Sequence, residues 1–202
     1  MRERLYRPQE DPQQQNHHYQ KSDDTVAQKK VVSQNEKDAA IRAHYFEIVA
    51  KGEEHYLEAI QYIIDTYKLD SSHAVMIYWP KLTDVLATTE GKLGGSFALI
   101  KIGPDCFRKE INFGVICRAV AHELIHSQQR TVDNMTDGHE REFLANYDTA
   151  TRTDLPPIKN VLDLKKYVNK ALEHYKMLPD SKKMKYIFKR NDLDSIKNKF
   201  GF

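Results

Sequence analysis

One segment constrains the fold of this chain more than any other: a helical pattern over residues 111–130 that is apolar on nearly every side. A helix that is apolar all round is a buried helix. Yet this segment contains His122-Glu123-Leu124-Ile125-His126, and two histidines and a glutamate are costly to bury unless they are paired or bind a metal. The chain must therefore form a core around a helix that carries polar chemistry.

The spacing of these residues indicates the chemistry. On a helix, residues four apart lie on one face, so His122 and His126 can reach the same metal ion. Glu123 points beside the metal, where a carboxylate can take a proton from a water molecule. Zinc suits nitrogen and oxygen ligands, and a catalytic zinc site keeps one position open for water. The motif therefore predicts a zinc site with Glu123 as general base.

A zinc site of this kind needs a third protein ligand, and the start of the next predicted helix offers three candidates, His139, Glu140 and Glu142. We favour Glu142, because Ala145 leaves space on its face and Asn146, four residues on, would be close enough to orient a ligating histidine. His139 and Glu140 lie within one turn of Glu142, so the choice stays open at the level of sequence.

The pattern His122-Glu123-x-x-His126 followed by Glu142-x-x-Ala145-Asn146 resembles the gluzincin arrangement of zincin metallopeptidases. In that family two histidines and a glutamate from a following helix hold the zinc, and the second motif commonly ends in Asp, where this chain has Asn146. Residues 97–105 are similar to the zincin edge strand, which pairs with extended substrate. The resemblance implies peptide-bond hydrolysis, with a further His, Tyr or Arg assisting the oxyanion. Tyr147, His139 and Arg130 are candidates, and the sequence selects none of them.

A second, weaker resemblance covers roughly residues 70–150. The segments 102–105, 122–129 and 140–142 look like the zincin-type toxin domains that end bacterial polymorphic toxins and Rhs proteins. This resemblance implies delivery as part of a secreted effector, and a cognate inhibitor or immunity protein as partner.

The order of patterns predicts an α+β, zincin-like fold with a small, mostly antiparallel sheet, a buried active-site helix and further packing helices. A helical pattern over residues 36–67 is interrupted at Gly52. The strands and later helices are expected at 74–79, 85–89, 96–102, 111–130, 138–152 and 161–177.

Three regions follow from composition. Residues 1–35 are polar, with few and unperiodic apolar residues, and are predicted to be a disordered leader or linker. Residues 36–179 are the expected zincin-like domain. Residues 180–202 form a basic tail with seven Lys or Arg against three Asp, and one short helix is expected around Lys183–Lys189.

Composition also excludes several classes of protein. The net charge is +2, which does not suggest a nucleic-acid binder. Two cysteines rule out a disulfide-dense scaffold and a four-cysteine zinc site. The apolar runs are too short for a membrane helix, and the N-terminus has no apolar signal core. We therefore expect a cytoplasmic protein, or one delivered as part of an effector, with no membrane partner.

The leading hypothesis is a zinc metallopeptidase that acts on a protein or peptide substrate. Two alternatives stay open. One is a non-enzymatic module with a structural metal, in which the basic tail binds a partner. The other is a regulatory intracellular peptidase that cleaves a repressor; in those proteins Ala often follows the third ligand directly, and here Phe143 follows Glu142.

Overall fold

The computed structural model describes residues 35–202, so the polar segment predicted over residues 1–35 lies outside the described part except for its last residue. The chain divides into two compact units, residues 1–43 and 44–202. In the first unit, the described residues 35–43 are helical. The second unit holds every other element, and residues 180–202 belong to the same unit as the predicted metal ligands.

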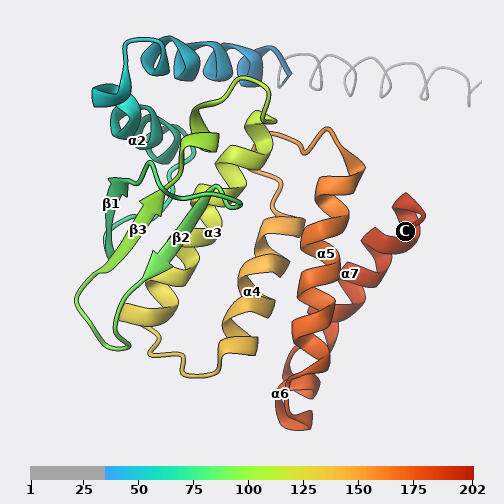
Figure 1. The fold of residues 1–202 in the computed structure, drawn as a ribbon. Coiled ribbons are helices and arrows are strands. Elements are labelled where there is room, and N and C mark those ends of the chain that lie inside the picture. Colours follow the sequence, from blue (N-terminus) through green and yellow to red (C-terminus); the bar gives the residue numbers. More distant parts are fainter. Residues whose placement is uncertain (1–34) are drawn as a thin grey trace, which may run out of the picture. The chain divides into compact units, whose positions relative to one another are not determined.

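After a helical start over residues 44–49, the second unit is an α+β fold, as predicted (Figure 1). Its elements in chain order are η1 (Glu53–His55), α2 (Tyr56–Thr66), β1 (Ala74–Tyr78), β2 (Ala87–Glu90), β3 (Ala98–Ile102), η2 (Pro104–Phe107), α3 (Phe113–Thr131), α4 (Gly138–Thr151), α5 (Val161–Lys176), α6 (Asp180–Lys185) and α7 (Ile187–Phe200).

The sheet is mixed, whereas the sequence predicted a mostly antiparallel one. Its strand order is β1-β3-β2, with β3 parallel to β1 and antiparallel to β2. The third strand takes the central place, and its residues Ala98, Ile100 and Ile102 are all buried on one face. Residues 97–105 are therefore not the edge strand that the resemblance implied; the edges are β1 and β2.

The α3 helix is the buried helix that the sequence predicted, and it contacts all three strands. Its inward residues include Ile116, Val120 and Leu124. The Asn112 side chain caps its start by accepting a hydrogen bond from the amide of Gly114 at 2.9 Å. The motif residues thus sit in the second half of a helix whose first half is firmly packed.

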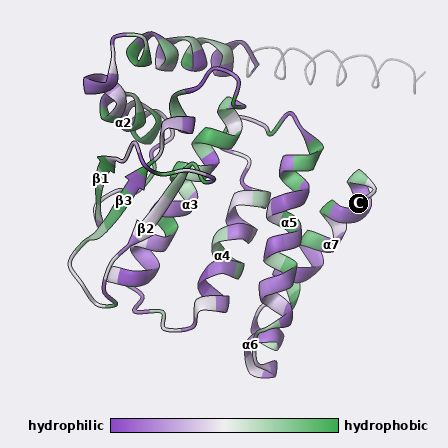
Figure 2. Cartoon of the chain, in the orientation of Figure 1, coloured by the Kyte–Doolittle hydropathy of each residue, from purple (hydrophilic) through white to green (hydrophobic). Residues whose placement is uncertain are grey.

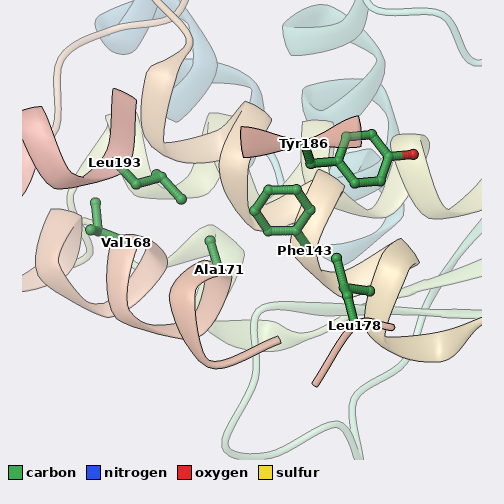
Figure 3. Close-up of a cluster of buried hydrophobic side chains, with 6 residues drawn as sticks. All are labelled: Phe143, Val168, Ala171, Leu178, Tyr186 and Leu193. Carbon is green, nitrogen blue, oxygen red and sulfur yellow. The ribbon is translucent and has the colours of Figure 1, made fainter. Parts of the chain in front are cut away.

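The helices α4, α5 and α7 build a second packed region (Figure 3), and their buried side chains meet around Phe143. Tyr186 and Leu193 from the basic C-terminal segment are part of this cluster. The segment forms two helices, α6 and α7, where one short helix was expected. Figure 2 shows hydrophilic and hydrophobic stretches alternating along α5 and α7, as expected of helices with one packed face. No helix within residues 35–202 has the length and apolar character needed to cross a membrane.

Candidate metal centre

Three of the predicted site residues converge. The Nε2 atom of His126 lies 3.3 Å from Oε1 of Glu142, and Nε2 of His122 lies 4.0 Å from Oε2 of the same carboxylate. One ligand atom from each residue lies within 4.8 Å of the other two. Within residues 35–202, no other His, Cys, Asp or Glu joins this group. The helices α3 and α4 therefore bring two imidazoles and one carboxylate to a common point, as the sequence predicted.

Hydrogen bonds determine which nitrogen of each imidazole faces this point. The Thr149 hydroxyl donates to the carbonyl of Ala145 at 2.7 Å, so its oxygen can accept the Nδ1 proton of His122, 3.2 Å away. The side-chain oxygen of Gln129 lies 2.8 Å from Nδ1 of His126 and can only accept a hydrogen bond. These contacts favour a proton on Nδ1 of each histidine, and they leave both Nε2 atoms directed at the shared point.

This arrangement favours a positive charge at the shared point, which a metal ion or a proton on His126 can supply, because nitrogen lone pairs and a carboxylate that face one another repel. Burial and the neighbouring His126 lower the pKa of His122 to about 4, so His122 does not supply that charge. Burial also works against charge on His126, but Glu142 raises the pKa of His126 overall. The donor set of two imidazole nitrogens and one carboxylate oxygen fits zinc.

Glu123, the predicted general base, lies beside the ligands and is held from the sheet. The hydroxyl of Thr89 in β2 donates to Oε2 of Glu123 at 2.7 Å. The same hydroxyl lies 3.0 Å from the backbone carbonyl oxygen of Glu123. Burial is the main cause that raises the pKa of Glu123. Because Thr89 occupies one carboxylate oxygen, the other remains available to a water molecule.

Glu140, an alternative third ligand, faces away from the histidines. It is buried, with 7% of its surface exposed. Lys182 of α6 lies 2.7 Å from Oε2 of Glu140, and the Tyr186 hydroxyl donates to Oε1. These contacts use the Glu140 carboxylate in joining α4 to the C-terminal helices.

The remaining candidates also have other contacts. His139 pairs with His174 of α5, with 3.1 Å between their Nδ1 atoms. Tyr147 donates to Asp192 at 2.8 Å, and Arg130 donates to the carbonyl of Gly91 at 3.2 Å. The structure thus brings His122, His126, Glu142 and Glu123 together, and ties Tyr147 and Arg130 to partners outside the metal group.

Asn146 has a different role from the predicted one. Its Nδ2 donates to the backbone carbonyl of Glu142 at 2.8 Å and lies 3.3 Å from Oε2 of that side chain. It therefore orients the carboxylate ligand and not a histidine. The reason is helical geometry: residues 142 and 146 are on the same helix, one turn apart, whereas the histidines are on α3.

Sequence reasoning missed four residues that support the site: Thr89, Arg118, Gln129 and Thr149. Arg118 is buried and donates to the carbonyls of Gly114, Thr149, Arg152 and Pro156. It thus ties the end of α4, where Thr149 meets His122, to α3. Gln129 carried a local signal, since it is three residues after His126 on one face. Thr89 carried none, because 34 residues separate it from Glu123.

No model of a protein family matches this sequence, and comparisons with curated proteins and with solved structures found no match either. The functional argument therefore rests on the geometry of the site itself.

Proposed function

We propose that this chain is a zinc-dependent metallopeptidase that hydrolyses peptide bonds in a protein or peptide substrate. The observation that carries this proposal is the convergence of three ligands, with Glu123 beside them and no fourth protein ligand among the described residues. Structural zinc sites are closed by four protein ligands, whereas catalytic sites use three and leave a position open. The Glu142 side chain is 42% exposed, which supports an accessible site.

The residues suit hydrolysis of an amide. A zinc ion held by His122, His126 and Glu142 would supply Lewis acidity, lowering the pKa of water to about 7 and polarising a carbonyl group. The oxygen of Glu123 that does not contact Thr89 takes a proton from the attacking water. At the same time the oxygen of that water bonds to the carbonyl carbon. Glu123 then gives that proton to the amine as the carbon–nitrogen bond breaks. Thr89 keeps the carboxylate in place through both transfers.

The edge strand β2 offers a site for the substrate backbone. It pairs with β3 on one side, and no described strand pairs with its other side. An extended peptide can add to such an edge through main-chain hydrogen bonds. Because Thr89 of β2 contacts Glu123, a peptide along this edge would pass the general base. This geometry supports a peptide substrate over a small molecule.

The toxin-like segments extend the proposal to a bacterial effector that has an immunity protein as its partner. This extension predicts that expression of the wild-type chain inside bacteria arrests growth, whereas expression of the Glu123→Gln variant does not. Growth curves with matched expression levels test it, and equal growth with both proteins would leave only the peptidase proposal standing.

The decisive experiment compares wild type with Glu123→Gln, each loaded with zinc. Glutamine cannot accept the proton, so we expect cleavage of a mixed peptide library to fall by at least about 100-fold. Zinc content should stay at wild-type level, because Glu123 is not a ligand. Mass spectrometry counts the cleaved peptides, and elemental analysis counts the zinc. Full cleavage by the Glu123→Gln variant would disprove the proposed mechanism.

A further inference from the structure

Arg130 lies on the same side of α3 as the general base. Seven residues, close to two turns of a helix, separate it from Glu123, so the two side chains follow one stripe of α3. The strand β2 packs on α3 along this stripe (Figure 1). Thr89 of β2 contacts Glu123, and the carbonyl of Gly91, one residue after β2, accepts a hydrogen bond from Nη1 of Arg130 at 3.2 Å. The edge strand therefore leads from the general base to Arg130.

The guanidinium of Arg130 has donors that the protein does not use. Its Nε is the only buried side-chain nitrogen among residues 35–202 that lacks a hydrogen-bond partner. Its Nη1 donates to Gly91, whereas its Nη2 is not buried and has no partner in the described part of the chain. Buried donors in native proteins nearly always find a partner. The unused edge formed by Nε and Nη2 thus indicates an acceptor that the chain itself does not supply.

The positive charge of Arg130 also lacks a counter-charge, since no carboxylate within residues 35–202 pairs with it. Arg152 and Arg190 each pair with an aspartate. Arg118 and Arg141 donate to backbone carbonyls instead, but neither keeps a buried nitrogen without a partner. An acceptor that suits Arg130 is a carboxylate, because a guanidinium binds both oxygens of that group in one plane.

The loop after β2 does not depend on the Arg130 side chain for its link to α3. The amide of Gly94 donates to the backbone carbonyl of Arg130 at 2.8 Å, and this bond is independent of the side chain at residue 130. Gly91 also packs closely on β3, where a Cβ added to it would lie 3.1 Å from the Cβ of Ala98. The guanidinium is therefore available for a role beyond holding the loop.

The length of the strand determines which part of a substrate would meet Arg130. Thr89 and Gly91 are two residues apart, which is about 7 Å along a strand. A peptide bonded to the outer side of β2 has the same repeat. When its scissile carbonyl lies beside Glu123, the peptide residue about two positions away lies beside Gly91. Arg130 is thus placed to contact the substrate about two residues from the bond that is cleaved.

We propose that Arg130 is a specificity-determining residue that binds a carboxylate of the substrate about two residues from the scissile bond. This inference rests on the proposed peptidase function. The accessible Nη2 makes the first contact, and the neighbouring Nε completes a bidentate pair with the second carboxylate oxygen. An acidic side chain and a C-terminal carboxylate offer the same group. This role differs from the oxyanion contact for which the sequence offered Arg130, because it concerns the choice of substrate and not the attacked carbonyl.

The test measures which peptides are cleaved by zinc-loaded wild type, Arg130→Gln and Arg130→Glu. The library places an acidic residue, its amide or Lys at each position around the cleaved bond, with free and with amidated C-termini. Wild type should prefer the carboxylate by at least about tenfold in kcat/KM. Arg130→Gln keeps a donor for Gly91 but loses the charge, so the preference should vanish, and Arg130→Glu should prefer Lys. A preference that survives amidation of the C-terminus assigns the carboxylate to a side chain, and one that is lost assigns it to the C-terminus.

The matched control is Arg190→Gln, which removes the charge of an arginine that pairs with Asp194 on α7. It should keep the preference of wild type. A purely structural role of Arg130 would lower the melting temperature of Arg130→Gln without changing its ratio of rates on acidic and amide peptides. An unchanged ratio in Arg130→Gln, or no preference in wild type, would overturn the role of Arg130 and leave the peptidase proposal intact.

A second measurement does not depend on turnover. Calorimetry with zinc-loaded Glu123→Gln, which should bind peptides without cleaving them, compares the best acidic peptide with its amide analogue. Adding Arg130→Gln should weaken binding of the acidic peptide by at least about tenfold and leave binding of the amide analogue unchanged. Equal weakening for both peptides would contradict the carboxylate contact. If zinc-loaded wild type cleaves no peptide of the library, both proposals are overturned together.

Discussion

Two glutamates on α4, only two residues apart, have opposite environments. Glu140 is buried and meets Lys182 and Tyr186, which satisfy its carboxylate within the fold. Glu142 is 42% exposed and faces the Nε2 atoms of two imidazoles. The partner of the first carboxylate is the ammonium group of Lys182, whereas the partners of the second are imidazole nitrogens, which can also bind a metal ion. The two carboxylates differ, in this molecule, in whether their partners could share a metal ion with them.

The strongest test of this comparison is metal binding. Glu142→Ala removes one of three ligands, so zinc affinity should fall by more than about 100-fold, beyond the usual effect of losing a supporting contact. Glu140→Gln should bind one zinc per chain, which is also the expectation for wild type. Elemental analysis after dialysis against a weak chelator distinguishes them. Zinc loss in Glu140→Gln with retention in Glu142→Ala would reverse the assignment.

For the free energy of unfolding, the substitution at Glu140 should have the larger effect of the two. Glu140→Gln removes a buried carboxylate that accepts from Tyr186 and pairs with Lys182, so the free energy of unfolding should fall by about 1–3 kcal/mol. Urea unfolding of the zinc-free protein measures it. Glu47→Gln is a suitable control, because that side chain is 71% exposed and its ion pair among residues 35–202 is with His44 at 3.1 Å. An equally large loss of stability in Glu47→Gln would show that the buried contacts of Glu140 contribute no more than those of an exposed glutamate.

Loss of a hydrogen bond to Nδ1 of a histidine should have a smaller effect on zinc affinity than loss of a ligand. Thr149→Val keeps the shape of the side chain but removes the acceptor for Nδ1 of His122, so zinc affinity should drop by about tenfold. Thr151→Val is the matched control, since its hydroxyl donates to a backbone carbonyl one turn back at 2.9 Å, just as that of Thr149 does. Competition with a fluorescent zinc chelator gives both affinities. Identical values would show that Thr149 does not orient His122.

The smallest expected effect concerns pH. Burial acts to raise the pKa of Glu140, but Lys182 and Tyr186 lower it below the model-peptide value of 4.5 overall. A lowered pKa means that this carboxylate stabilises the fold above about pH 4.5, and that the contribution is lost as the pH falls through the folded-state value. The stability difference between wild type and Glu140→Gln should therefore shrink below pH 4.5. A difference that stays constant down to pH 3 would contradict the ion-pair explanation.

Much of the secondary structure could be predicted because its signals are local. The helices expected over residues 111–130, 138–152 and 161–177 are α3, α4 and α5 within two residues at each end. Strand order could not be predicted in the same way, because pairing joins segments far apart in the sequence. The central position of β3 depends on how the chain crosses from β1 to β2, and no local pattern records that crossing.

The candidate site shows the same division. The sequence alone determined that His122 and His126 share a helical face with Glu123 beside them, since helical spacing fixes these relations within one element. It also determined that Glu140 and Glu142 point to different sides of α4, because two residues turn a helix by about 200°. Which side faces α3 was decided only by the tertiary structure. Packing of α4 against α5 and α7 buries Phe143 and brings Lys182 to Glu140, and this leaves the Glu142 side to meet the histidines.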